Sequence, residues 1–237
     1  APQKTAEVDI RMNLPAGDTV IAGAIAFDPT DPLTFNHSTS VTIFDSLGDS
    51  HVMTYYFRKT AANEWSMYAG VDGTLVDIPG GVGTIVPSPT PGTISPTNPT
   101  GSVSAAQLTF SSGGDFISRV PALPANIQTE TLNANILTNG SDTTQDIIID
   151  FNLDPTGPNP NEPTQFASNF EVTALEQDGL AVGRLTGLDI DADGLVRATY
   201  SNGTSEPLSR IPLLNFANNQ GLTQVGNTSW KVRLVSG

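Results

Sequence analysis

Residues 6–14 read Ala-Glu-Val-Asp-Ile-Arg-Met-Asn-Leu, an unbroken alternation of apolar and polar side chains. Successive side chains of a β-strand point to opposite faces, so this stretch predicts a strand with one buried and one solvated face. A lone strand needs a sheet, because its backbone N–H and C=O groups and its apolar face require partners. The fold of the chain therefore depends on which later strands pair with residues 6–14.

Short runs of β-forming residues follow, separated by Gly, Asn, Asp and Pro. Residues 41–44, 51–59 and 65–69 predict a three-stranded antiparallel meander with turns at 45–49 and around Asn63. Further strands are predicted at 107–110, 131–137, 145–152, 170–172, 185–190 and 195–200. The run Ile147 to Phe151 is almost continuously apolar, which predicts burial on both faces. No 12-residue window has helical apolar spacing without Gly or Pro, so we expect an all-β protein with little or no helix.

Proline clusters suggest how the strands divide into domains. Breaks at 28–32 and 155–163 forbid continuous strand pairing, and six prolines between residues 79 and 101 predict an exposed loop. Residues 1–15 then find their sheet partners after the second break. We expect two β-domains, one discontinuous (1–15 plus 166–237) and one inserted into it (16–165).

The composition excludes several classes of function. The chain has 24 acidic and 10 basic residues, a net charge of −14, which repels nucleic acid and anionic lipid. Cysteine is absent, which excludes disulfides, thiolate catalysis and Cys-ligated zinc. No apolar stretch approaches the ~20 residues that cross a bilayer. We therefore expect neither a nucleic-acid nor a membrane partner.

Residues 189–194 read Asp-Ile-Asp-Ala-Asp-Gly, which matches the opening of a calcium-binding loop. The match then ends, because the twelfth position holds Tyr200 in place of a bidentate glutamate. A β-hairpin turning at 192–194 explains the same residues, since Asp-Gly supplies the positive φ of a tight turn. We predict this hairpin, no metal site, and no change of stability on adding calcium.

The sequence offers few candidate catalytic residues. Gly48-Asp49-Ser50 is similar to the nucleophile block of one class of serine hydrolases, which requires a histidine base. Only His37 and His51 are present, and His51 directly follows Ser50 in an expected strand, so the two side chains point to opposite faces. A turn joining two strands is the simpler interpretation. We therefore predict no catalytic residues and no cofactor.

Two possibilities stay open at the level of the sequence. Tyr55, Tyr56, Trp65 and Tyr68 offer a platform for sugar stacking, although aromatic residues in a meander usually form core and cross-strand pairs. The 24 acidic residues always provide some spatial pair for glycoside hydrolysis. The alternative function is therefore a secreted β-sandwich module that binds carbohydrate or another ligand.

Several segments resemble flagellar hook proteins. Phe-Asp-Pro-Thr-Asp-Pro at 27–32, the segment from Ser38 to Gly48, and Tyr-Phe-Arg-Lys at 56–59 are similar to the outer domain of that family. Segments 175–179, 183–187, 200–203 and 215–222 look like the inner β-domain shared by hook and distal-rod proteins. The stretch from about Pro79 to Asn126 matches nothing comparable.

This resemblance implies a structural subunit of the bacterial flagellar hook, the flexible joint that transmits torque from motor to filament. It implies an inner domain (1–15 plus 166–237) with an outer domain (16–165) inserted. The implied partners are copies of itself, rod proteins and hook–filament junction proteins. The implied location is extracellular, reached through the flagellar secretion apparatus without a cleaved signal peptide. The terminal helices that drive polymerisation in this family are missing, so we expect a core fragment that is monomeric; its interface residues are unknown.

Overall fold

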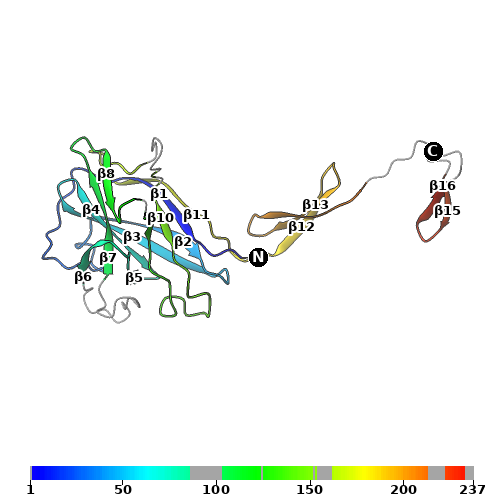
Figure 1. Cartoon of the computed structure of the whole chain (residues 1–237), viewed down its shortest axis with the longest axis horizontal. Helices are drawn as coiled ribbons and strands as arrows, with labels where there is room; N and C mark the ends of the chain where they lie inside the picture. The colour runs from blue at the N-terminus through cyan, green and yellow to red at the C-terminus, as the bar shows by residue number, and fades with distance from the viewer. Residues whose placement is uncertain are drawn as a thin grey trace. The chain divides into compact units, whose positions relative to one another are not determined.

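The computed structural model describes residues 2–85, 103–123, 125–151, 153, 162–212 and 222–232. Its contacts divide the chain into two compact units, unit 1 (Ala1–Val182) and unit 2 (Gly183–Gly237). Every regular element in the described residues is a β-strand. The all-β prediction is therefore confirmed (Figure 1).

The larger sheet of unit 1 has seven strands in the order β2-β3-β4-β7-β6, with β5 paired to β4 and β8 paired to β7. The predicted meander is confirmed as antiparallel β2–β3–β4, with Asn63 at positive φ in the second turn. The strands are β2 (His37–Phe44), β3 (Ser50–Ala61), β4 (Glu64–Val71), β5 (Thr74–Val76), β6 (Val82–Ile85), β7 (Val103–Phe110) and β8 (Phe116–Val120).

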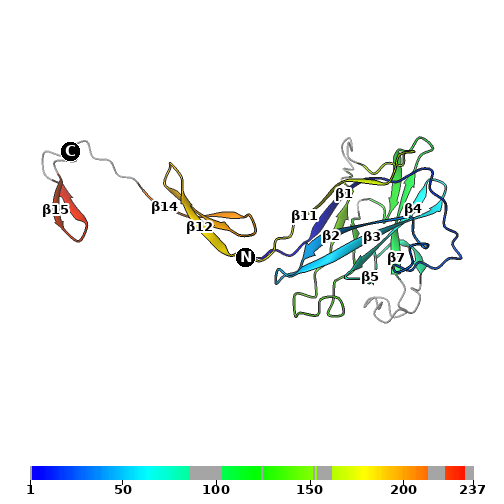
Figure 2. The same cartoon turned by 180° about the vertical axis from the view of Figure 1, so that it is seen from behind.

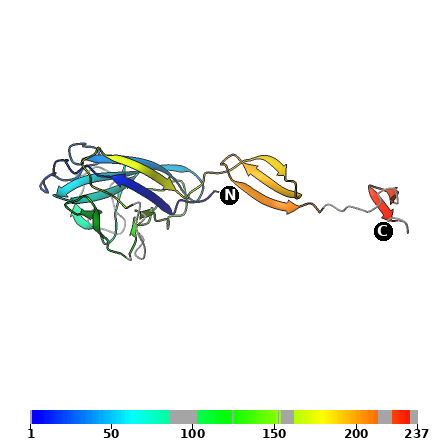
Figure 3. The same cartoon turned by 90° about the horizontal axis from the view of Figure 1, so that it is seen from above.

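The second sheet of unit 1 contains the strand predicted from residues 6–14. Its order is β11-β1-β10-β9, comprising β1 (Glu7–Asn13), β9 (Ile127–Gln128), β10 (Ile148–Asp150) and β11 (Glu171–Gln177). Strand β1 lies between its partners, antiparallel to β11 and parallel to β10. Figure 2 shows β1 and β11 side by side, seen from behind. Figure 3 shows β1, in blue, beside β11, in yellow.

The two sheets of unit 1 share one hydrophobic core. The apolar face of β1 is buried as predicted, with Val8 and Ile10 at 0% exposure. These side chains belong to the same cluster as Tyr55 and Trp65 of the larger sheet. Burial of both sheets against one core stabilises unit 1 as a sandwich-like body, because each sheet covers the apolar face of the other.

The strand predicted at 131–137 is wrong. The backbone N–H groups of Ile136 and Leu137 both donate to the carbonyl of Asn133, and the Asn133 side chain accepts from the N–H of Asn135, which makes a turn. Asparagine favours such local bonds over a strand ladder. Leu132 and Leu137 are nevertheless buried. The apolar residues of this segment therefore indicated burial correctly, but not the backbone conformation.

The predicted burial of the run from Ile147 to Phe151 on both faces is also wrong. The regular strand is only Ile148–Asp150, and burial alternates: Ile147, Ile149 and Phe151 are buried, whereas Ile148 is half-buried. The sheet that contains β10 faces the core on one side only, so every second side chain of the run lies toward the surface.

The division into residues 1–15 plus 166–237 and residues 16–165 stays a prediction. Strand β1 pairs with β11, which lies in the first set, and with β10, which lies in the second. The proline-rich loop predicted at 79–101 is wrong for residues 82–85, which form β6 at the edge of the larger sheet. The rest of that loop beyond residue 85 lies outside the described residues, as do Pro155, Pro158 and Pro160.

Unit 2 contains a three-stranded antiparallel sheet and a hairpin. The sheet comprises β12 (Leu185–Ile190), β13 (Leu195–Tyr200) and β14 (Ser205–Arg210), and the hairpin comprises β15 (Leu222–Gly226) and β16 (Ser229–Val232). The predicted hairpin at 185–200 is confirmed. Gly194 has a φ of +75°, and Asp191 Oδ1 accepts from the N–H groups of Asp193 and Leu195.

Candidate assembly surfaces

Two adjacent cations of β3 hold the long segment between β1 and β2. Arg58 is 3% exposed and its Nη2 donates to the carbonyls of Ala22 and Ile25, both at 2.8 Å. Lys59 is 5% exposed and its Nζ donates to the carbonyl of Ala16 at 2.6 Å. Both cations bind backbone oxygens instead of carboxylates. The Arg-Lys pair of the family-like segment 56–59 therefore fixes this surface segment to the sheet.

The second buried arginine of unit 1 acts similarly. Arg119 on β8 is 8% exposed and donates to the carbonyls of Pro121 at 2.8 Å and Ala125 at 2.7 Å. Burial lowers its pKa, and the negative charge of Asp150 opposes that shift. Arg119 thus fixes the segment that leads from β8 to β9.

His51, which follows Ser50, contacts two carboxylates through its ring nitrogens. Nδ1 of His51 lies 2.7 Å from Asp72 Oδ2, and Nε2 lies 3.4 Å from Asp45 Oδ2. Burial alone would lower its pKa, but the hydrogen bonds with Asp72 and Asp45 raise it. With both ring nitrogens engaged, His51 is not placed as a base for the Ser50 hydroxyl. His37 likewise contacts Asp18 and stacks on Phe170 with ring centroids 4.5 Å apart.

The aromatic side chains considered for sugar stacking are mostly internal. Tyr55 and Trp65 are 0% exposed and Tyr68 is 4% exposed. Burial raises the pKa of Tyr55 far above its ordinary value. Trp65 donates its indole N–H to Gln165 Oε1 at 2.9 Å. These rings form the core, so they do not offer the exposed faces that a sugar platform requires.

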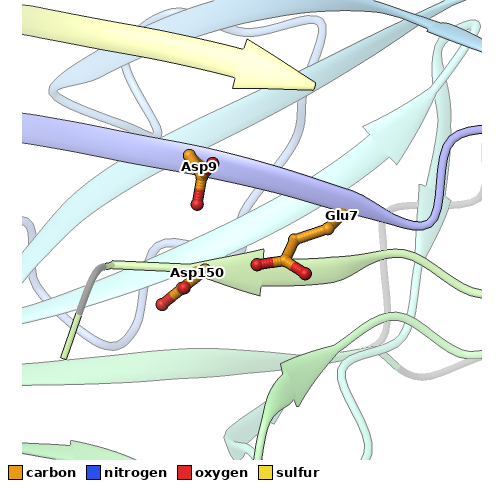
Figure 4. Close-up of side chains that lie close together, drawn as sticks. All are labelled: Glu7, Asp9 and Asp150. Carbon is orange, nitrogen blue, oxygen red and sulfur yellow. The ribbon is translucent and has the colours of Figure 1, made fainter. Parts of the chain in front are cut away.

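Three carboxylates gather on the solvated side of the smaller sheet (Figure 4). Glu7 and Asp9 come from β1 and Asp150 from β10, and one oxygen of each lies within 4.8 Å of the others. Asp9 pairs in register with Asp150 on one side and with Glu176 of β11 on the other. Like charges directly opposite one another destabilise a sheet.

The two carboxylates of β1 in this cluster, Glu7 and Asp9, have raised pKa values. Burial, followed by the charge of Asp150, raises the pKa values of both Glu7 and Asp9, while Arg11 lowers that of Asp9. A cavity of about 270 Å³ borders the cluster, lined by Glu7, Asp150, Arg119 and apolar side chains of β9 and β10. Carboxylate oxygens in this arrangement could hold a divalent cation or share a proton.

Unit 2 exposes large apolar side chains in place of burying them. Leu185, Leu188 and Ile190 of β12 are 58%, 60% and 56% exposed, and Trp230 of β16 is 58% exposed. Monomeric proteins seldom expose contiguous apolar surface without a use for it. The sheet of unit 2 is therefore the second candidate surface.

Sequence reasoning missed both surfaces for the same reason. The polar face of residues 6–14 predicted solvated carboxylates, but Asp150 reaches Glu7 and Asp9 only through a parallel pairing across some 140 residues. Alternation in 185–190 predicted a strand but could not show whether another layer packs on its apolar face.

No helix in the described residues has the length and hydropathy of a membrane span.

Comparison with known proteins gives a consistent family. The family model "Flagellar basal body protein FlaE D2 domain" matches residues 13–180. The flagellar hook protein FlgE of Salmonella typhimurium is 28% identical over 237 residues, covering 100% of this chain and 49% of that protein. FlgE of Escherichia coli K12 is 29% identical over 248 residues, with the same coverage. The chain therefore spans about half the length of these relatives.

A solved structure shows a weaker similarity. The crystal structure of Helicobacter pylori flagellar hook protein FlgE2 aligns with a TM-score of 0.42 at 17% identity, covering 82% of this chain and 36% of that one. The family model accounts for most of unit 1, including the β2–β3–β4 meander, β10 and β11, and it begins at the last residue of β1. The chain belongs to the flagellar basal body protein FlaE D2 domain family.

Proposed function

We propose that this chain is the central part of a structural subunit of the bacterial flagellar hook, the flexible joint between motor and filament. The observation that carries the proposal is the family match over residues 13–180, together with hook-protein relatives that align along the whole chain. The proposed role is mechanical, and no residue is assigned a chemical step.

The net negative charge of unit 1 supports a role in a flexible joint, in which contacts between neighbouring subunits break and form again. Unit 1 holds 20 acidic and 5 basic residues, a net charge of −15, and its large aromatic side chains lie mainly in the core. Neighbouring copies that carry such charge repel at long range, and polar side chains supply many of the contacts between them at short range. Weak polar contacts can exchange as a tube bends, whereas a dry apolar interface resists sliding.

The buried cations support a subunit that keeps its shape under force. Arg58, Lys59 and Arg119 each tie a surface segment to a strand of the core through hydrogen bonds with carbonyl groups. Charged donors make stronger bonds than neutral ones, and these are shielded from water. Segments held in this way keep their shape while contacts outside them change.

The proposed partners are further copies of the subunit in the hook, with rod proteins and hook–filament junction proteins at its two ends. The proposed location is outside the cell, after export by the flagellar secretion apparatus without cleavage of a signal peptide. The isolated 237-residue chain is proposed to be a monomer, since its net charge of −14 opposes association.

The test is genetic and structural. The gene that encodes these residues is deleted from its host, and hook–basal bodies are isolated and viewed by electron microscopy. We expect basal bodies without hooks, restored by the intact gene, and antibodies raised against the chain should label the restored hooks. Normal hooks in the deletion strain, or labelling confined to another structure, would contradict the proposal.

A further inference from the structure

The larger sheet of unit 1 has an outer face with a side-chain cluster of its own. Tyr56 of β3 pairs with Tyr68 of β4, and two residues away on each strand Arg58 pairs with Ser66. Side chains two residues apart on a strand point the same way, so both pairs lie on one face. Phe27, from the segment between β1 and β2, stacks on Tyr68 with ring centroids 4.3 Å apart. This cluster is separate from the core that the two sheets share.

Arg58 on this face is a buried cation without a carboxylate partner. It is 3% exposed, and its Nη2 donates to the carbonyls of Ala22 and Ile25. No ion pair among the described residues includes Arg58. Its Nε, which is also buried, has no hydrogen-bond partner in that part of the chain. Buried charges in proteins are normally paired, so this guanidinium lacks one anion.

A pocket of about 280 Å³ opens beside the guanidinium. The side chains that give it polar character come from β3 and β4 and are Arg58, Thr60, Ser66 and Tyr68. Its other walls come from Ile21 and Gly23 of the segment between β1 and β2 and from Gly83 of β6. At Gly83, which has a φ of +64°, a Cβ would lie 4.0 Å from Tyr68 Oη. The missing side chain keeps the pocket open next to that hydroxyl.

The pocket contains hydrogen-bond donors that are still free. Within the described ranges, Nη1 of Arg58 and the hydroxyls of Ser66 and Tyr68 make no hydrogen bond. The hydroxyl of Thr60 is already bonded to Glu64 Oε1 at 2.8 Å, and Glu64 does not line the pocket. Burial raises the pKa of Tyr68 although the charge of Arg58 lowers it, so the phenol keeps its proton at neutral pH. One cation and two hydroxyl donors therefore suit an acceptor with a negative charge.

We propose that this pocket binds one carboxylate group, which accepts hydrogen bonds from Arg58 Nη1 and from the hydroxyls of Ser66 and Tyr68. A carboxylate supplies the missing negative charge and two oxygens that accept from separate donors. Unit 1 has a net charge of −15, which repels anions at long range, and a group with a single charge is repelled least. The site does not depend on the proposed function.

Two sources carry this chemistry, and the experiment separates them. One is a small free carboxylate, and the other is an acidic side chain of another copy of the chain, whose unit 1 holds 20 acidic residues. Acetate represents the first source, and a rise in protein concentration without acetate represents the second. Both are measured by NMR on the same nitrogen-15-labelled chain of 237 residues.

Acetate replaces chloride at constant ionic strength in the titration. The backbone amides of Gly23, Ser66 and Gly83 report binding, because these residues line the pocket. We expect their signals to follow one saturable curve in the millimolar range, since a ligand of so few atoms binds weakly. Amide signals of unit 2 should not follow that curve.

Matched variants test the assigned donors. Tyr68→Phe removes one hydroxyl, keeps the ring that stacks on Phe27, and should weaken acetate binding by about threefold to tenfold. Tyr56→Phe is the control and should bind as the wild type does, because Tyr56 pairs with Tyr68 but does not line the pocket. If Tyr68→Phe folds poorly, Ser66→Ala repeats the test with the other hydroxyl. Arg58 is kept, because it also holds the segment between β1 and β2.

Two outcomes overturn the proposal. Signals that shift linearly without saturation would show an adventitious additive only, and equal affinity of the wild type and Tyr68→Phe would remove the assigned donors. If a rise in protein concentration shifts the same amides and acetate reverses that shift, the carboxylate comes from another copy. If acetate saturates the site and protein concentration has no effect, the ligand is a free carboxylate. No measurement involves a hook, so failure of the proposed function would leave these results unchanged.

Discussion

Units 1 and 2 are both built from β-strands, yet they bury their apolar residues to very different extents. Ile10 in β1 is 0% exposed, whereas Ile190 in β12, also in an alternating strand, is 56% exposed. Unit 1 closes two sheets over one core, and unit 2 presents a single sheet and a hairpin. Alternation therefore specifies which face of a strand is apolar, and a second layer is needed to bury that face in a core.

The largest expected effect comes from separating the units. Residues 1–182 alone should fold, because both sheets and the shared core lie within them. Residues 183–237 alone should not form a stable structure, because so short a piece with no second layer over its sheet buries little apolar surface. Circular dichroism and limited proteolysis of the two pieces check this, with the whole chain as control.

The same comparison bears on the predicted inserted domain. If residues 1–15 and 166–237 form a domain of their own, deleting residues 28–165 and joining the flanks with a short Gly/Ser linker leaves a folded protein. If this deletion product is folded and the 1–182 piece is unfolded, the chain divides into residues 1–15 plus 166–237 and residues 16–165, and not into units 1 and 2.

The next largest effect is a matched truncation of two isoleucines. Ile10→Ala should reduce the free energy of unfolding of unit 1 by about 2–5 kcal/mol, because it leaves a cavity in a closed core. Ile190→Ala should change stability by less than about 0.5 kcal/mol, because its side chain is already largely exposed. Urea unfolding followed by Trp65 fluorescence in a Trp230→Phe background reports unit 1, and circular dichroism reports the whole chain. If Ile10→Ala and Ile190→Ala reduce the free energy of unfolding equally, units 1 and 2 do not differ in how well they bury apolar side chains.

A pair of arginines should show a smaller contrast. Arg58→Met removes a buried donor from the carbonyls of Ala22 and Ile25 and should cost about 1–3 kcal/mol. Arg210→Met removes an exposed bond to the Asp193 carbonyl and should cost less than about 0.5 kcal/mol. Hydrogen exchange of residues 16–25 should quicken in the first variant only. Unchanged exchange there would show that Arg58 does not hold the segment.

The smallest effect expected is a gain in stability from neutralising one carboxylate. Burial and the charge of Asp150 raise the pKa of Asp9 in the folded state, so folded protein binds this proton more tightly than unfolded protein does. Its contribution to stability is therefore greatest below the unfolded pKa, near 4, and declines as pH rises through the raised pKa. Asp9→Asn should raise the melting temperature by about 1–3 °C at pH 7, because like charges opposite one another cost about 0.2–1 kcal/mol.

This gain should vanish near pH 3, where the carboxylate is protonated in both states. Asp189→Asn is the control in unit 2, because Asp189 pairs with Arg197 and has no carboxylate opposite it on that strand. It should leave the melting temperature of unit 1 unchanged. If the gain in melting temperature from Asp9→Asn does not depend on pH, its cause is packing and not the removal of a charge.

Local sequence patterns were enough to predict the features that depend on neighbours along the chain. Alternation in residues 6–14 specified strand β1 and its buried face, turn residues specified the β2–β3–β4 meander, and Asp-Gly at 193–194 specified the β12–β13 hairpin. Part of the family resemblance also lay in local segments, such as 27–32 and 56–59. Side-chain period and turn chemistry act over a few residues, so they can be read without knowing the fold.

Contacts between residues far apart in the sequence could not be predicted and became visible in the folded chain. The parallel pairing of β1 with β10 brought Asp150 to Glu7 and Asp9, and the paths of surface segments placed carbonyl groups on Arg58 and Lys59. The turn at 133–137 buried its leucines without becoming a strand. These outcomes depend on competition among all apolar surfaces and hydrogen-bonding groups for one core, and that competition is settled across the whole chain at once.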